Sequence, residues 1–186
     1  MRDATARFHR WRKGAQTKKN PKMTTTQVIG KGKSVSIDGL SVDVHSQLRL
    51  TCGCPPSVCV SYQHAQASIG GNRFTAGEAL LSGKRCGSVV TRVVSGRSVY
   101  GRVTQFLRVT CGCHHFVEVA VVEWFPLPTY PDGDPLTVKI DLRGVDVNNV
   151  GVGTVVSLFD IQPSRVLVDI DQHCMYMMRM EGLDSM

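Results

Sequence analysis

Residues 88–125 read SVVTRVVSGRSVYGRVTQFLRVTCGCHHFVEVAVVEWF, and this stretch decides the fold. Valine and other strand-favouring residues alternate with polar residues through 88–94 and again through 98–110, on either side of Ser95-Gly96-Arg97. Alternation around a short glycine-containing turn predicts a long antiparallel hairpin. Residues 116–125 are the most apolar strand candidate in the chain and predict a third strand.

Similar short segments continue on both sides of this stretch. Alternating residues around Asp38-Gly39 predict a hairpin over 35–44. Further strands are predicted over 48–54, 58–62, 136–142, 155–161, 164–170 and 173–180. Loops are predicted over 63–76, 127–135 and 143–153, where Gly, Pro, Asn and Gln gather, and residues 77–83 are predicted to form one helical turn.

This spacing of strands predicts a mainly β fold, a small antiparallel barrel or sandwich. Leu, Ala and Glu are too sparse for a helical bundle, whereas Val and the 18 glycines favour strands and turns. We expect one β-rich domain over residues 28–180, with a hairpin subregion at 28–83, a barrel core at 86–171 and a tail at 181–186.

The positive charge of the chain is concentrated at its N-terminus. Residues 1–22 carry a single acid and a net charge of +7, which equals the net charge of the whole chain. The eight basic residues are Arg2, Arg7, Arg10, Arg12, Lys13, Lys18, Lys19 and Lys22. Residues 1–27 are too polar to bury a core, so we expect a disordered basic arm that contacts nucleic acid or another polyanion.

The targeting signals of the chain are weak. No apolar run is long enough to span a bilayer, and the N-terminus lacks the apolar segment of a secretory signal. An Arg-rich, acid-poor start is compatible with a mitochondrial transit peptide, although it holds few Ser and Pro21 interrupts any long helix. We expect an intracellular protein, with the nucleus favoured.

Two nearly identical segments carry most of the cysteines. Residues 48–54 (LRLTCGC) and 107–113 (LRVTCGC) each end in a Cys-Gly-Cys pair. Two such pairs supply four thiolates, the number of ligands that a tetrahedral Zn²⁺ site needs. The candidate ligands are Cys52, Cys54, Cys111, Cys113 and His114. Burial as small apolar side chains is the alternative, and Cys86 and Cys174 stand alone.

Three aromatic residues near the central hairpin are candidates for binding a partner. Tyr100, Trp124 and Tyr130, together with Phe125, are suited to enclosing a cationic group through cation–π contacts. The alternative places Trp124 and Phe125 in the core with the tyrosines at its rim.

No catalytic motif is evident. Gly30-Lys31-Gly32-Lys33 lacks the Walker pattern, and no serine stands in a nucleophile elbow. The aspartate pairs 132/134 and 169/171 have the spacing to bind a divalent cation, but Asp132 and Asp134 flank a glycine and favour a turn. We therefore expect no catalytic residues.

Residues 98–170 resemble bromo-adjacent homology (BAH) domains, including modules beside transposon-derived open reading frames. The resemblance rests on three segments: 99–103 (VYGRV), 122–126 (VEWFP) and 159–166 (FDIQPSRV). The family usually has Arg before the proline, where this chain has Phe125. The resemblance implies a compact β-barrel core, no catalysis and binding to chromatin or protein partners.

The leading hypothesis is a non-catalytic interaction module that binds chromatin, protein or nucleic acid, with electrostatic contacts from the arm. One alternative is a fragment of a mobile-element protein related to transposases or nucleases, which would bring three acids together. Another is a small structural protein stabilised by Zn²⁺.

Overall fold

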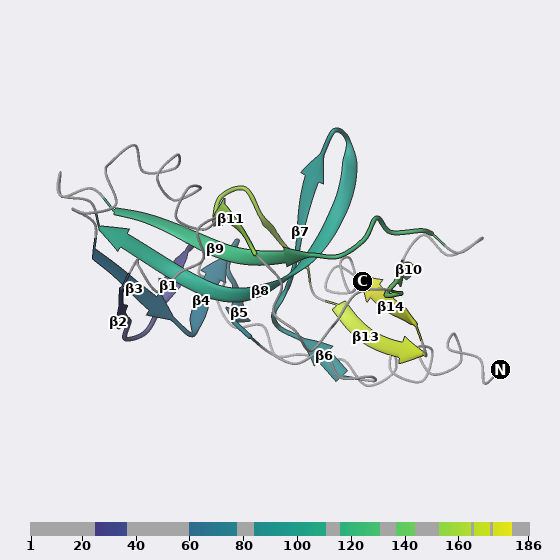
Figure 1. Ribbon diagram of the computed structural model, residues 1–186, viewed down its shortest axis with the longest axis horizontal. Coiled ribbons are helices and arrows are strands. Elements are labelled where there is room, and N and C mark those ends of the chain that lie inside the picture. Colours follow the sequence, from purple (N-terminus) through teal and green to yellow (C-terminus); the bar gives the residue numbers. More distant parts are fainter. Residues whose placement is uncertain are drawn as a thin grey trace.

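The computed structural model describes residues 25–36, 60–77, 84–110, 116–130, 137–143, 153–164, 166–171 and 173–179. These residues form antiparallel β-strands and no helix, so the predicted mainly β class is confirmed (Figure 1). In the same residues there is no helix long and apolar enough to cross a membrane.

The central hairpin lies where the sequence predicts it. Strands β7 (Val89–Val94) and β8 (Arg97–Thr110) pair from Val94↔Arg97 to Val89↔Arg102. Ser95 and Gly96 form the two-residue turn and have φ values of 50° and 75°. Positive φ at both central residues is the conformation of a type I′ turn, whose twist matches that of the paired strands.

Strand β8 is the central and longest strand of the largest sheet. Along one edge it pairs with β9 (Phe116–Trp124), from Gly101↔Trp124 to Thr110↔Phe116. Along the other edge its first half pairs with β7 and its second half with β3 (Val60–His64). Strands β2 (Lys33–Val35), β11 (Thr154–Ser157) and β12 (Gln162–Pro163) complete the seven strands, in the order β11-β9-β8-β3-β2 with β12 on β7.

A three-stranded sheet corrects one sequence prediction. It contains β1 (Gln27–Ile29), β4 (Gln66–Ile69) and β5 (Asn72–Thr75) in the order β1-β4-β5. The prediction of a loop over 63–76 is therefore wrong, because Gly70 and Gly71, with φ values of 56° and 80°, form a tight hairpin turn. Strand β1 begins at Gln27, the last residue of the range predicted to be the arm.

A four-stranded sheet holds the C-terminal strands. Its order is β10-β14-β13-β6, from β10 (Thr137–Asp141), β14 (Cys174–Arg179), β13 (Val166–Asp171) and β6 (Lys84–Cys86). Strand β11 ends earlier than predicted, because residues 158–160 turn away from it. None of the three sheets closes on itself in the described part of the chain, so the sequence prediction of a barrel is not confirmed.

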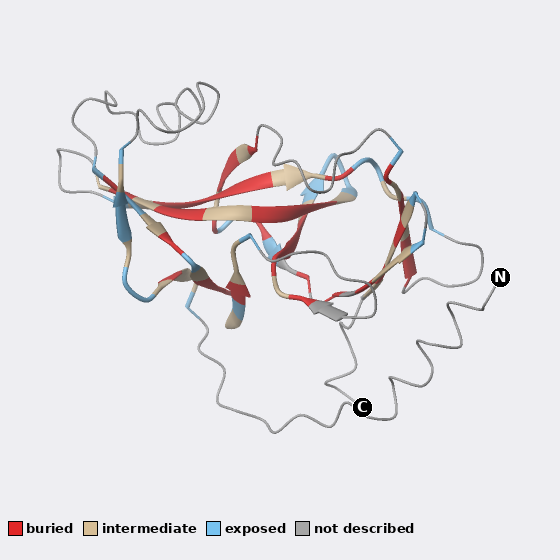
Figure 2. Cartoon of the chain, turned by 60° about the horizontal axis from the view of Figure 1, so that its bottom comes forward, coloured by how far each residue is buried: buried red, intermediate tan, exposed pale blue. Residues whose placement is uncertain are grey.

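Three clusters of buried side chains hold the sheets together. Figure 2 colours the buried residues of the strands red. The first lies between the three-stranded sheet and one face of the large sheet and includes Val28, Phe74, Phe106 and Ala120. The second joins the four-stranded sheet to the base of the β7–β8 hairpin around Tyr100. The third lies on the opposite face of β8 and β9. Its buried members are Leu107, Val109, Val119, Val121 and Val155.

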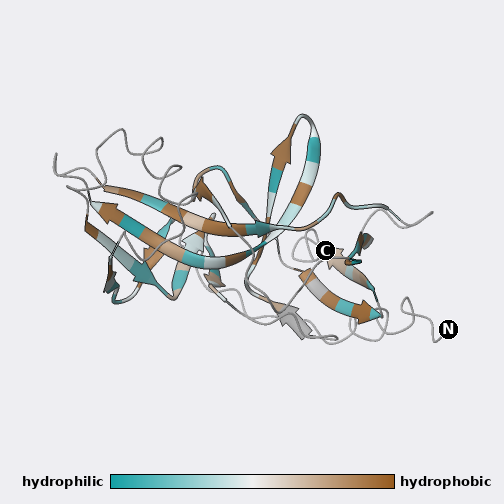
Figure 3. Ribbon diagram, viewed as in Figure 1, coloured by the Kyte–Doolittle hydropathy of each residue, from teal (hydrophilic) through white to brown (hydrophobic). Residues whose placement is uncertain are grey.

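One irregularity in β8 decides which side chains share a face. The register with β9 shifts between Val103 and Gln105, so Thr104 is an extra residue in the ladder, and its hydroxyl donates to Val121 O at 3.2 Å. The bulge keeps Val103 and Phe106 on the same face, since both belong to the first cluster. Hydropathy alternates along these strands accordingly (Figure 3).

Several sequence predictions concern residues outside the described ranges. These include the hairpin around Asp38-Gly39, the strand over 48–54 and the helical turn over 77–83.

Candidate partner-binding surface

The large sheet exposes two aromatic rings on either side of an arginine, at the end where β8 finishes and β9 begins. We call this surface the ring platform and define it by five side chains on one face of three neighbouring strands. They are Val60 and Tyr62 of β3, Arg108 and Thr110 of β8, and Phe116 of β9.

The register of the strands places these side chains in two adjacent rows. Val60, Thr110 and Phe116 are successive cross-strand partners, and in the next row Tyr62 is the partner of Arg108. Side chains in one row point to the same face of the sheet, and residues two apart on a strand share that face. The five side chains therefore form one surface.

This surface continues the face that carries the first core cluster, and its two rings are far more exposed than that cluster. The next row inward, with His64, Phe106 and Ala120, is covered by the three-stranded sheet and is buried. Outward from that row, Tyr62 is 38% exposed and Phe116 is 59% exposed. Neighbouring large apolar groups that stay open to solvent are typical of interaction sites.

A buried carboxylate fixes the arginine at the centre of the platform. Glu118, the cross-strand partner of Arg108 on β9, has a side chain only 5% exposed. Its Oε1 accepts hydrogen bonds from Arg108 Nε at 2.9 Å and Nη2 at 2.5 Å. Its Oε2 accepts one from the Val28 N–H at 3.1 Å. Both carboxylate oxygens are therefore used, which orients the guanidinium before any partner arrives.

Arg108 also lies over one of the two rings. Its Cζ is 5.0 Å from the centroid of the Phe116 ring, within the range of a cation–π contact. On the opposite side of Arg108 lies Tyr62, one strand away. Guanidinium and aromatic planes are the side-chain surfaces on which flat, unsaturated ligands stack.

The edge of the platform is closely packed. A methyl group on Gly32, between β1 and β2, would lie 2.8 Å from Tyr62 Cβ and 2.7 Å from His64 Nε2. Because real Cβ contacts are not that short, only glycine lets the chain pass so close to Tyr62. The tyrosine is thus supported on one side by backbone.

The aromatic residues chosen from the sequence do not form a site together. Tyr100 is fully buried in the second cluster, so the prediction that it binds a partner is wrong for this fold. Trp124 packs partly against the first cluster and Phe125 is buried in the second, as the core alternative anticipated. Tyr100 and Trp124 point to opposite faces, because Trp124 is the partner of Gly101. Tyr130 is exposed in the loop after β9.

The other predicted site residues lie mostly outside the described ranges. These are the eight basic residues of the arm and the candidate metal ligands Cys52, Cys54, Cys111, Cys113 and His114. The described residues that border two cysteine clusters, Val60 after Cys59 and Thr110 before Cys111, are cross-strand partners. The strands adjoining those clusters therefore meet at the edge of the ring platform.

Within the described residues, the aspartates on β13 do not belong to a group of three or more possible metal ligands. Asp169 and Asp171 lie on the outer face of the four-stranded sheet, opposite Tyr176 and Cys174 of β14. Across the described residues, no three His, Cys, Asp or Glu side chains come together in a way that would hold a metal ion. Cys86 is buried, with its Sγ 3.1 Å from Ser88 Oγ, and Cys174 is half-buried.

The ring platform could not be identified from sequence position alone. Tyr62 and Arg108 are separated by 46 residues in the chain and meet only through the β3–β8 register. A partial signal was available, since Val60 and Tyr62, like Arg108 and Thr110, are spaced two apart and thus share a face of a strand.

Comparison with known proteins found no matching family model, no matching curated protein and no matching solved structure.

Proposed function

We propose that this protein is a non-catalytic nucleic-acid-binding module that stacks unpaired bases on its ring platform. The single observation that carries the proposal is the surface made by Tyr62, Arg108 and Phe116, with the arginine held by the buried Glu118. Every base has a π-face, so such a surface binds single strands with little dependence on sequence.

Charge supports nucleic acid over a neutral ligand. The N-terminal 22 residues carry the whole net charge of +7, and they lead into β1, whose Val28 is bonded to Glu118. Lys31 and Lys33 are also exposed on and beside β2, the strand next to that of Tyr62. We propose that the arm contacts phosphates while the platform contacts bases, since phosphate contacts supply affinity and positioning.

The spacing of the rings suits more than one base. Tyr62 and Phe116 lie on strands two apart in the sheet, which places their backbones about 10 Å from each other. Each stacked base is worth about 1–3 kcal/mol when its aromatic partner is replaced by alanine. Loss of both rings should therefore raise the Kd by at least about 30-fold.

The test is a binding assay with a fluorescein-labelled, single-stranded oligonucleotide of mixed sequence, followed by anisotropy. The variant Tyr62→Ala/Phe116→Ala should bind at least about 30-fold more weakly than wild type. Tyr130→Ala is the matched control, because Tyr130 is 51% exposed and lies in the loop after β9, beyond Trp124 and at the opposite end of that strand from Phe116. Equal affinity of the double variant and the control would refute the stacking role.

The role of the arm has its own test. Deleting residues 1–22 should remove most of the affinity and flatten the salt dependence of binding. Eight phosphate contacts on a single strand correspond to a log–log slope of about −6, so loss of the arm is measurable in a salt series. Equal binding by the truncated and full-length proteins at low salt would refute the electrostatic part of the proposal.

A second candidate function is binding to a chromatin protein or another protein, as the likeness of residues 98–170 to BAH domains implies. The observation in its favour is the same surface, because Tyr, Phe and Arg side chains in oriented contacts are typical of protein hot spots. A BAH-like barrel and a nuclear location stay proposals that rest on the sequence. Unchanged oligonucleotide binding by the double variant would favour this second function.

A further inference from the structure

A second surface lies at the opposite end of β8, on the hairpin that β8 forms with β7. We define the projecting hairpin as residues 92–99, from Arg92 of β7 to Val99 of β8. The hairpin extends away from the three sheets into solvent (Figure 1). At its base, Thr91 and Tyr100 are buried in the body of the protein.

The tip of the hairpin exposes apolar side chains that no described segment covers. Val93 is 53% exposed and Val94 is 45% exposed, so neighbouring valines on opposite faces both reach solvent. β12 pairs with β7 only at Val90 and Thr91, and the pairing of β9 with β8 begins at Gly101. The hairpin is thus a two-stranded ribbon with solvent on both faces.

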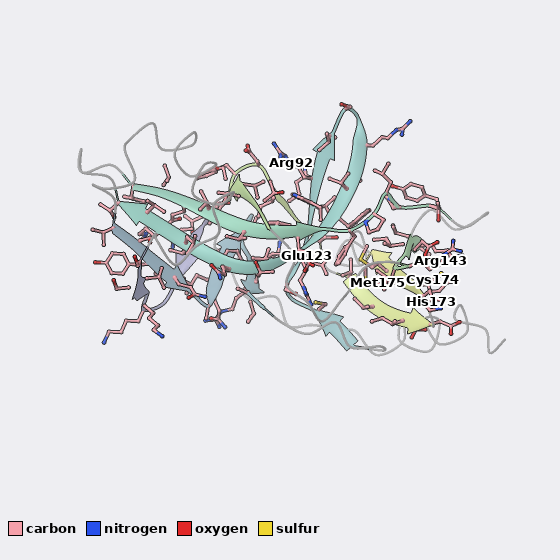
Figure 4. All side chains as sticks on the ribbon, in the orientation of Figure 1. Arg92, Glu123, Arg143, His173, Cys174 and Met175 are labelled. Atoms are coloured by element: carbon pink, nitrogen blue, oxygen red, sulfur yellow. The ribbon has the colours of Figure 1, made fainter. Side chains whose placement is uncertain are left out.

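One face of this ribbon is basic. Arg92 is the cross-strand partner of Val99, and Arg97 is the partner of Val94, so these four side chains share a face. Figure 4 labels Arg92 on the β7 strand of this hairpin. Residues 89–101 include both arginines and no acid. Among the described residues, neither arginine has an ion-pair partner, in contrast to Arg102 below them, which is bonded to Glu123 at 2.8 Å.

We propose that the projecting hairpin is a DNA-binding ribbon that enters the major groove of a duplex. The major groove of B-DNA is about 12 Å wide and 8.5 Å deep, and it admits a two-stranded β-ribbon. From Thr91 to the turn the ribbon extends four residues, or about 13 Å, which exceeds the depth of the groove. Arginine is the commonest side chain to contact guanine O6 and N7, and the valines suit the thymine methyl group.

This inference goes beyond the ring platform and uses different residues, so the two proposals succeed or fail separately. The platform needs unpaired bases, whereas the hairpin needs a duplex. Charge favours DNA over a protein strand as the occupant. A protein strand that paired with β7 along Val93 and Val94 would lie next to Arg92 and Arg97, which have no ion-pair partner among the described residues. A second copy of this chain would bring its own Arg92 and Arg97 into that contact.

The test compares two variants on two probes by anisotropy. The probes are a labelled 20-base-pair duplex and a labelled 20-nucleotide single strand. Arg92→Gln/Arg97→Gln should weaken duplex binding by about 10-fold or more and leave single-strand binding within twofold, since one bidentate contact gives about 5- to 150-fold discrimination. Tyr62→Ala/Phe116→Ala should weaken single-strand binding and leave duplex binding within twofold. Because Arg97 is exposed and Arg92 is half-buried on a surface ribbon, thermal melting should show both variants folded.

A modified duplex separates groove contact from phosphate attraction. Replacing guanine by 7-deazaguanine removes the N7 acceptor from the major groove and leaves the phosphates in place. Wild-type protein should bind this duplex several-fold more weakly, and Arg92→Gln/Arg97→Gln should not distinguish the two duplexes. An equal loss on duplex and single strand, indifference of the wild type to 7-deazaguanine, or a changed oligomeric state of the variant would each overturn the proposal.

Discussion

Glu118 connects the core to the ring platform through hydrogen bonds to Val28 and Arg108. Removing its charge tests both the stability of the fold and the orientation of the platform. The change Glu118→Gln keeps the shape of the side chain and removes its charge. In the wild type, Glu118 accepts from Arg108 through Oε1 and from the Val28 N–H through Oε2. A glutamine has one acceptor oxygen and one NH₂ donor, so it cannot serve both partners.

The expected size of the effect follows from burial. A hydrogen bond to a charged group contributes about 1.5–3 kcal/mol, and breaking a fully buried ion pair costs about 3–5 kcal/mol. The Arg108 side chain is 38% exposed and regains some hydration once released, so we expect a loss of about 2 kcal/mol. For a chain of 186 residues, this lowers the Tm by about 4–8 °C.

The assay is urea denaturation followed by tryptophan fluorescence, with thermal melting alongside. The midpoint should fall while the m-value stays constant, because the change alters stability and not the surface exposed on unfolding. A double-mutant cycle with Arg108→Met should give a coupling energy above about 0.5 kcal/mol. A Tm shift under 1 °C, or additive effects of the two changes, would refute the account of this network.

A matched pair in the same two strands serves as the control for binding. Arg102 and Glu123 also join β8 to β9, with a hydrogen bond of 2.8 Å, but no platform ring lies beside them. Glu118→Gln should weaken single-strand binding because Arg108 loses its orientation. Glu123→Gln should leave that binding unchanged at a temperature where both variants are folded. Equal losses of binding would show that the effect comes from stability alone.

The remaining predictions concern three other features. Gly101→Ala should lower the unfolding free energy by about 1–3 kcal/mol in urea denaturation, because a Cβ there would lie 2.5 Å from Val122 Cγ1 and 2.8 Å from Trp124 Cε3. Hydrogen bonds from Arg143 lower the pKa of Asp141 to about 2, so an NMR titration should show that midpoint, and Arg143→Gln should return it toward 3.8. Since the folded pKa is depressed, the contribution of this pair to stability is present above pH 3.8 and is lost as the pH falls through 2. If the Cys-Gly-Cys segments bind Zn²⁺, purified protein should contain about one zinc and melt lower after chelation, whereas absent metal and an unchanged Tm would exclude that site.

Local patterns were sufficient to predict much of the fold. The turn between β7 and β8 and the strands on either side of it depend on residues adjacent in sequence. They lie within one residue of their predicted bounds, although Arg97, predicted in the turn, belongs to β8. The β4–β5 hairpin was missed because Gly70-Gly71 within a polar segment is equally typical of a loop. A glycine pair becomes a recognisable turn only when the pairing of its neighbours is known.

Sequence reasoning failed at the candidate site for a different reason. The platform depends on long-range register, which sets Tyr62 beside Arg108 and Arg108 beside Glu118. The bulge at Thr104 also reverses the alternation within β8, so a strict two-residue period would place Val103 and Phe106 on opposite faces. Tyr100 was selected for its chemistry, but its strand position buries it completely.

The hydrogen bond from Val28 to Glu118 also determines where the first part of the chain is attached. Thr25 is three residues before Val28, so the basic segment that precedes it joins the body within about 11 Å of Val28, whose N–H is bonded to Glu118. Once one of two linked surfaces has bound a polyanion, the other meets the same molecule at an effective concentration in the millimolar range. The basic segment and the ring platform, each binding weakly alone, would then bind the same polyanion much more tightly together, without any new contact.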